Sequence, residues 1–195
     1  MKKFWILVMV LALVATPAMA KKKAVEEPEN GDDTPMSAKT FASLKLRNIG
    51  PAINSGRVSD FAVHPNAHHS IYAATASGNL WKTSNAGTTW EPIYDQEGAY
   101  AIGCVTLDPN NPNVVWVGTG ENNSQRSVAF GDGVYKSLDG GQNWENVGLE
   151  ESEHIGTITI DPRDSNIVYV ASQGPLWRSG GERGVYKTTD GGDTW

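Results

Sequence analysis

Two carboxyl side chains on one predicted loop, Glu121 and Asp132, are the residues best placed to do chemistry. Hydrolysis of a glycosidic bond needs a pair of carboxyl groups across the scissile bond, one protonated as general acid and the other ionised. Glu121 can supply one of them, with Asp132 on the same loop, and a partner can also come from another part of the protein. The alternative is structural: Glu121 accepts hydrogen bonds from neighbouring amides or from Arg126. The sequence favours this role, because functional carboxylates are marked by their surroundings.

Polar and aromatic side chains near this loop form a predicted ligand-binding set. Its members are Arg57, Asn122, Asn123, Arg126, Trp177 and Arg178. Arginine can hold a ligand carboxylate through two parallel hydrogen bonds, although Arg57 and Arg126 can equally bond loop carbonyls and carboxylates. We expect no cofactor and no metal, because His68 and His69 lack further ligands at suitable spacing. Cys104 is the only cysteine, which excludes an internal disulfide, and its apolar surroundings predict a buried, inert thiol.

Three copies of one hairpin must position these residues. The copies span 80–90, 134–144 and 185–195, and each contains the turn Ser/Thr-x-Asp/Asn-x-Gly-x-x-Trp. A short Asp or Asn side chain can bond back to turn amides, and the glycine can adopt a positive φ. The Trp buries a large ring and leaves an indole N–H to find an acceptor. We therefore expect structural roles for Asn85, Gly87, Trp90, Asp139, Gly141, Trp144, Asp190, Gly192 and Trp195.

Each hairpin follows two further predicted strands joined by a proline turn. The first strands are predicted at 58–63, 102–107 and 155–160, and the second at 70–75, 113–118 and 166–171. Proline ends a strand because it lacks a backbone donor and forces its predecessor to be extended. Four antiparallel strands, named A to D in order, repeated about every 50 residues are typical of a β-propeller blade. A sandwich would not repeat one turn at one place, and solenoid repeats are usually shorter.

The fold class predicted is therefore all-β, a propeller of four-stranded antiparallel blades. The blade units span about 57–95, 101–148 and 155–195 within a partial propeller at 41–195. Three blades form only an arc, because propellers typically close with four to eight. We expect this sequence to be the N-terminal fragment of a larger propeller.

The hairpin turns resemble the Asp-box, or bacterial neuraminidase repeat, of sialidases, xyloglucanases and sortilin-type receptors. The strings at 117–127 and 55–60 look most like secreted bacterial sortilin-like proteins, many of which carry a glycosyl hydrolase label. The resemblance covers roughly 46–195. It implies that the Asp-boxes brace the blades and lie away from the substrate. Sialidases bind an acidic sugar with an arginine cluster and use a Tyr nucleophile, and no such set can be assigned in this sequence.

Strand order separates two faces of the predicted arc. The A–B and C–D turns emerge on one face, and the B–C loops and D-to-A connections emerge on the other. Long polar loops at 119–133 and 172–184 place ligand binding on the second face. We predict an exported sortilin-like propeller that binds a protein, peptide or glycan there. The alternative is a glycoside hydrolase that acts on a polysaccharide with carboxylates from several blades. A third hypothesis is an assembly-factor role like that of photosystem-associated Asp-box propellers.

The N-terminal region is predicted to be a signal peptide at 1–20 and a disordered linker at 21–40. Lys2 and Lys3 precede an apolar run too short for a comfortable membrane span, and Ala18-Met19-Ala20 is a small-x-small cleavage site. We expect a periplasmic or extracellular protein with no stable membrane span after cleavage. The net charge of −6 argues against nucleic acid as a partner.

Overall fold

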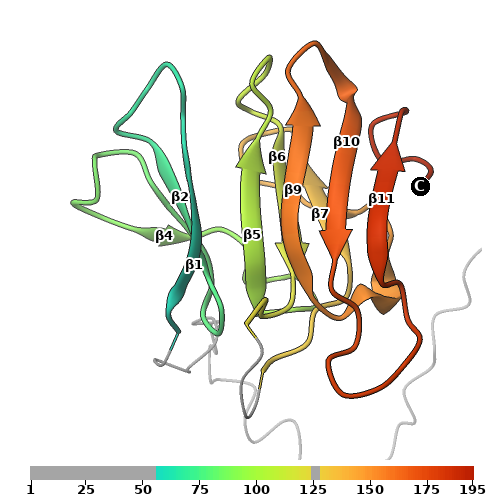
Figure 1. Ribbon diagram of the computed structural model, residues 1–195. Coiled ribbons are helices and arrows are strands. Elements are labelled where there is room, and N and C mark those ends of the chain that lie inside the picture. The colour runs from blue at the N-terminus through green and yellow to red at the C-terminus, as the bar shows by residue number, and fades with distance from the viewer. Residues whose placement is uncertain (1–55, 124–127) are drawn as a thin grey trace, which may run out of the picture. The chain divides into compact units, whose positions relative to one another are not determined.

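The computed structural model describes residues 56–123 and 128–195. Three antiparallel sheets follow one another along the chain (Figure 1). The strands are β1 (Val58–Val63), β2 (Ile71–Thr75), β3 (Asn79–Thr83) and β4 (Glu91–Pro92), then β5 (Ile102–Leu107), β6 (Val115–Thr119), β7 (Val134–Ser137) and β8 (Glu145–Asn146), then β9 (Ile155–Asp161), β10 (Asp164–Ser172) and β11 (Gly184–Thr188). The predicted signal peptide, the linker and Arg126 lie outside the described residues.

The all-β propeller prediction is confirmed. Within each sheet, the strands pair with their sequence neighbours in the order of a blade, and the third sheet has three strands in the described part of the chain. Within 56–123 and 128–195, the one helical element is a 3-10 turn at Glu150–Ser152. No helix among the described residues is long and apolar enough to cross a membrane.

Neighbouring blades touch along their first strands. Ser59 Oγ donates to the carbonyl of Ile102 at 2.6 Å, and Thr106 Oγ1 donates to the carbonyl of Ile158 at 2.9 Å. Two apolar clusters fill the spaces behind these strands, one between the first and second sheets and one between the second and third. The core is therefore a series of interfaces between blades, and burial of these side chains fixes how each blade sits on the next.

The repeated turns are held by a hydroxyl and a carboxyl or amide working together. In the second turn, Asp139 Oδ1 accepts from the backbone N–H of Asn143 at 2.9 Å, and Ser137 Oγ accepts from the N–H of Gly141 at 2.8 Å. Gly141 has φ of 92°, where a side chain would be strained. Hydrogen bonds from Asn143, then from Ser137, lower the pKa of Asp139 to about 2. The carboxylate thus serves as a turn acceptor.

Two contacts tie the second and the third repeated turn to the blade before it. Trp144 Nε1 donates to the carbonyl of Ile93 at 2.8 Å, and Trp195 Nε1 donates to the carbonyl of Val147 at 2.7 Å. Strand C of the earlier blade adds a lysine, since Lys82 Nζ donates to the carbonyl of Gly140 at 2.9 Å. Lys136 Nζ makes the same bond to Gly191 at 2.8 Å. The acceptor of each indole therefore belongs to the preceding blade.

Candidate functional site

One end of the three sheets collects the long connections and is called the loop face. It comprises the described residues of 76–78, 93–101, 120–133, 147–154 and 173–183. In Figure 1, the loop from β10 to β11 lies at the opposite end of its sheet from the β9–β10 turn. The repeated turns lie with the β9–β10 turn, because each follows a strand that runs away from the loop face. The faces are thus arranged as strand order predicted.

Glu121 is buried and forms an ion pair with Arg57. Its Oε2 also accepts a long hydrogen bond from the N–H of Ala129, at 3.4 Å. Asn123, with its amide oxygen turned toward Arg57, accepts from Nε at 2.9 Å and from Nη2 at 3.0 Å. The structure therefore brings three predicted site residues together. Glu121 is therefore held by an arginine and by a backbone N–H, which is the environment of a carboxylate that fixes the position of a loop.

Asn122 connects the second blade to the third on the loop face. Its Nδ2 donates to the carbonyl of Gly103 at 2.9 Å, and its carbonyl accepts from Gln173 Nε2 at 3.0 Å. These bonds tie the loop after β6 to the first strand of its own blade and to the loop after β10. Gln173 was not among the predicted site residues, because its partner lies 51 positions away.

His154, just before strand β9, has a fully buried imidazole. Neither ring nitrogen has a hydrogen-bond partner among the described residues, and the ring packs against Phe130 with centroids 5.6 Å apart. Burial lowers the pKa of His154 below its ordinary value, against the opposing effect of Glu121 and Glu153. The side chain is therefore neutral at neutral pH.

Three large aromatic rings are exposed on the loop face: Tyr100, Phe130 and Trp177. They come from the connection between the first two blades and from the two long B–C loops. Beside Trp177, Arg178 forms an ion pair with Glu153 across the third blade entrance. These exposed rings offer apolar faces on which a ligand could pack.

A second carboxyl group lies near Asp132, and it is Glu97. Tyr135 Oη donates to Asp132 Oδ2 at 2.9 Å, and the backbone N–H of Asp132 donates to Thr119 Oγ1 at 2.9 Å. A side chain on Gly98 would collide with Asp132 Oδ2, which places that oxygen against the backbone next to Glu97. Burial, then the charge of Asp132, raises the pKa of Glu97.

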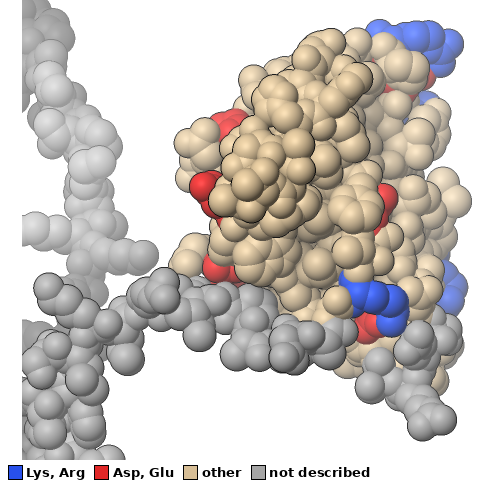
Figure 2. Space-filling model, turned by 90° about the vertical axis from the view of Figure 1, so that its left-hand side faces the viewer, with Lys and Arg blue, Asp and Glu red and all other residues tan. Residues whose placement is uncertain are grey.

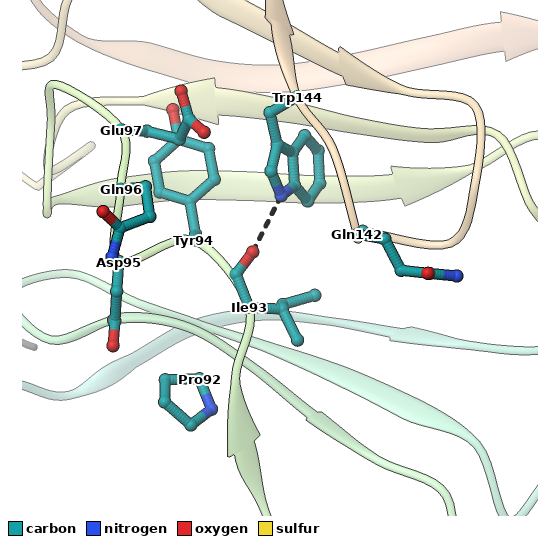
Figure 3. Close-up of a pocket in the computed structure, with 9 residues that line it drawn as sticks. Pro92, Ile93, Tyr94, Asp95, Gln96, Glu97, Gln142 and Trp144 are labelled. Atoms are coloured by element: carbon teal, nitrogen blue, oxygen red, sulfur yellow. Dashed lines mark hydrogen bonds between the residues drawn. The ribbon is translucent and has the colours of Figure 1, made fainter. Parts of the chain in front are cut away.

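Glu97 also lines a groove of about 420 Å³ between the first two blades. Residues 92–97 form one wall, and Gly141, Gln142 and Trp144 form the other (Figure 3). The hydroxyl of Tyr94 points toward Glu97 in Figure 3, is buried, and has no hydrogen-bond partner among the described residues. Glu121 and Asp132 thus belong to separate networks, and the carboxyl beside Asp132 is Glu97.

No family model matches the chain. Among curated proteins, it is 27% identical over 138 residues to the xyloglucanase Xgh74A of Acetivibrio thermocellus, a match that covers 64% of the chain and 15% of the relative. It is 23% identical over 225 residues to the oligoxyloglucan-reducing end-specific xyloglucanase of Emericella nidulans, covering 83% of the chain and 27% of the relative. The chain resembles xyloglucanases. It spans only a small part of their length.

Solved structures of xyloglucanase type share the fold. An ancestral GH74 enzyme superposes with a TM-score of 0.56 at 24% identity, covering 70% of the chain and 18% of the enzyme. The GH74 xyloglucanase of Xanthomonas campestris superposes with a TM-score of 0.53 at 19% identity, covering 72% of the chain and 20% of the enzyme. At these identities the likeness supports the propeller fold. The narrower sortilin-like assignment stays a prediction.

The described residues contain no group of three His, Cys, Asp or Glu side chains that could hold a metal ion. The loop face carries carboxyl groups, arginines and exposed aromatic rings. The proximity of Glu97 to Asp132 was not predicted from the sequence. Its only signal was an acidic side chain in the connection after strand D, on the face where ligands were expected.

Proposed function

We propose that this protein is a glycoside hydrolase-type propeller that binds a β-glucan of the xyloglucan class on its loop face. The observation that carries the proposal is the placement of Tyr100, Phe130 and Trp177, exposed together on the face that also holds two carboxyl networks. Sugar rings present apolar C–H faces that pack on aromatic rings, and their hydroxyl groups bond to carboxylates and amides. The similarity to xyloglucanases supports the choice of this class of glycan.

In this proposal, Glu97 and Asp132 are the carboxyl pair for chemistry, in place of Glu121 and Asp132. Glu97 is the general acid, because burial and a neighbouring carboxylate both raise its pKa. Asp132 is the partner carboxyl group, held by the hydroxyl of Tyr135. Two carboxyl groups in unlike environments are the arrangement that glycosidases use. Glu121 and Arg57 form an ion pair that holds the loop after β6 in place.

The proposal includes export, because a polysaccharide substrate lies outside the cell. The predicted signal peptide at 1–20 agrees with it, as do xyloglucanase relatives that act on a polymer. The acidic composition disfavours anionic ligands and nucleic acid, and it is compatible with a neutral glycan.

Hydrolysis and binding of xyloglucan, mixed-linkage β-glucan and sialosides test the proposal together. We expect xyloglucan to bind, Trp177→Ala to weaken binding at least tenfold, and Trp90→Ala, which removes an exposed Trp on the opposite face, to leave it unchanged. Glu97→Gln should abolish turnover and retain binding. Binding without turnover in the wild type would leave a glycan-binding propeller and refute the catalytic roles. Failure to bind any of these glycans would refute the proposed ligand class.

A further inference from the structure

Tyr94 lines the groove between the first two blades, and its neighbours fix the position of its ring. It is 1% exposed. The rings of Tyr135 and Trp144, both in the second blade, meet it edge to face, each with centroids 5.3 Å away. The backbone N–H of Glu97 donates to the carbonyl of Tyr94 at 3.3 Å, so residues 94–97 form a turn. The fixed ring therefore holds its hydroxyl toward Glu97 (Figure 3).

The Tyr94 hydroxyl is a buried polar group whose capacity for hydrogen bonds is unused. Within 56–123 and 128–195 it has no partner, a state that is unfavourable for a buried hydroxyl. Burial, then the nearby Tyr135, Asp132 and Glu97, raises the pKa of Tyr94. The hydroxyl therefore keeps its proton while the carboxyl groups titrate. It can donate one hydrogen bond and accept another.

Tyr135 and Asp132 lie on the other side of this hydroxyl. Tyr135 Oη donates its only hydrogen to Asp132 Oδ2 at 2.9 Å, so its oxygen can still accept one. Burial raises the pKa of Tyr135, which therefore also stays protonated. Gly98 lets these groups approach Glu97, because a side chain at Gly98 would collide with Asp132 Oδ2 and lie 3.5 Å from Tyr135 Oη.

Two other polar side chains border these groups, and both have partners of their own. Asn146 Nδ2 donates to the backbone carbonyl of Asp132 at 2.9 Å, and Asp95 Oδ1 accepts from Asn79 Nδ2 at 2.6 Å. On the side of the first sheet, acidic side chains lie apart from one another at the margins of the face (Figure 2). Salt largely screens exposed charges that are well separated. The titration of Glu97 is therefore set locally, by burial and then by Asp132.

We infer that Tyr94 is a positioning residue, whose hydroxyl lets Glu97 and Asp132 share one proton. In the order Glu97, Tyr94, Tyr135, Asp132, each group donates a hydrogen bond to the next. When each group passes its proton along, Glu97 becomes ionised and Asp132 becomes protonated. Both tyrosines stay neutral, so no other reactant is needed. The inference rests on the proposed function only in naming this pair as catalytic, where it keeps one carboxyl group protonated while the other is ionised.

Carbon-13 NMR titration of the two carboxyl carbons in the full chain tests the inference. A shared proton makes the carbons of Glu97 and Asp132 shift by comparable amounts in each of two steps. Tyr94→Phe keeps the ring and removes the hydroxyl, so each carbon should then titrate mainly in one step. Tyr72→Phe is the matched control, because the Tyr72 hydroxyl joins the same two blades by donating to the carbonyl of Gly140 at 3.1 Å. This control should keep both steps at both carbons.

Turnover of xyloglucan provides a second readout, because a hydroxyl that is buried does not contact the substrate. Tyr94→Phe should lower kcat about tenfold, the equivalent of one hydrogen bond, and leave KM unchanged. Circular dichroism checks the fold of each variant. Tyr135→Phe breaks the same chain of hydrogen bonds one step further along. It should give single titration steps as well, which keeps the test available if Tyr94→Phe does not fold.

Two titration results would overturn the inference. Single steps at each carbon in the wild type would show that no proton is shared. Two comparable steps that survive both Tyr94→Phe and Tyr135→Phe would show that the carboxyl groups act on each other through space alone. A wild type that shows the shared titration without hydrolysing xyloglucan would refute the catalytic roles and support the inference, so the two failures can be told apart.

Discussion

The indole of Trp144 should stabilise the protein by joining two blades. Two substitutions can separate the contribution of its hydrogen bond from that of its ring packing. Trp144→Phe removes the hydrogen bond to the carbonyl of Ile93, which is 2.8 Å long, and should cost about 1 kcal/mol in the free energy of unfolding. Trp144→Ala also removes the edge-to-face contact with Tyr94, whose ring centroid lies 5.3 Å away. Buried Trp→Ala changes cost about 3–5 kcal/mol, and Trp144 is only partly buried, so we expect about 3 kcal/mol.

Urea unfolding followed by circular dichroism measures these losses, provided that the slope of the transition is unchanged between variants. The chain contains its own control, because Trp90 occupies the same turn position in the first blade and is 38% exposed. Among the described residues, no acceptor bonds its indole N–H. Trp90→Ala should cost less than about 1 kcal/mol. Equal losses for Trp90→Ala and Trp144→Ala would refute the argument that these rings act between blades.

Four titratable groups give further predictions. Burial raises the pKa of Cys104 to about 12, so iodoacetamide should modify it only in unfolded protein. Burial lowers the pKa of His154 below 6.5, so stability should fall as pH drops below that value, where only the unfolded state gains a proton; His154→Phe should flatten this slope. Hydrogen bonds lower the pKa of Asp139 from 3.8, so its turn should loosen as pH falls toward about 2, which carboxyl NMR titration would detect. Asp132→Asn should lower the pKa of Glu97 in the same NMR measurement, without returning it to 4.5, because burial remains.

The fold could be predicted from sequence because its signals are local and repeated. Each blade can be recognised in the sequence by a proline turn and a glycine-containing turn. The backbone geometry of both turns depends on residues that are neighbours in the sequence. The lysine of strand C is equally regular, at Lys82, Lys136 and Lys187, yet its role was not predicted. Its partner is a carbonyl more than fifty residues away, and a backbone carbonyl leaves no mark in a sequence.

The site was less predictable because its partners come from distant segments. Arg126 was considered as a partner of Glu121, but the structure pairs Glu121 with Arg57, 64 positions away. Asp132 was placed with Glu121 because both lie on one loop, and the loop instead turns Asp132 toward the connection that holds Glu97. Shared location on a face could be derived from strand order. Which charges meet on that face depends on loop paths that the sequence pattern does not encode.

A crystal structure with a bound xyloglucan oligosaccharide would test the central claim most directly. The proposal predicts sugar rings stacked on Trp177 and Phe130, with the chain of sugars running toward Glu97 and Asp132. An oligosaccharide bound to the face of the repeated turns, with the loop face empty, would contradict it.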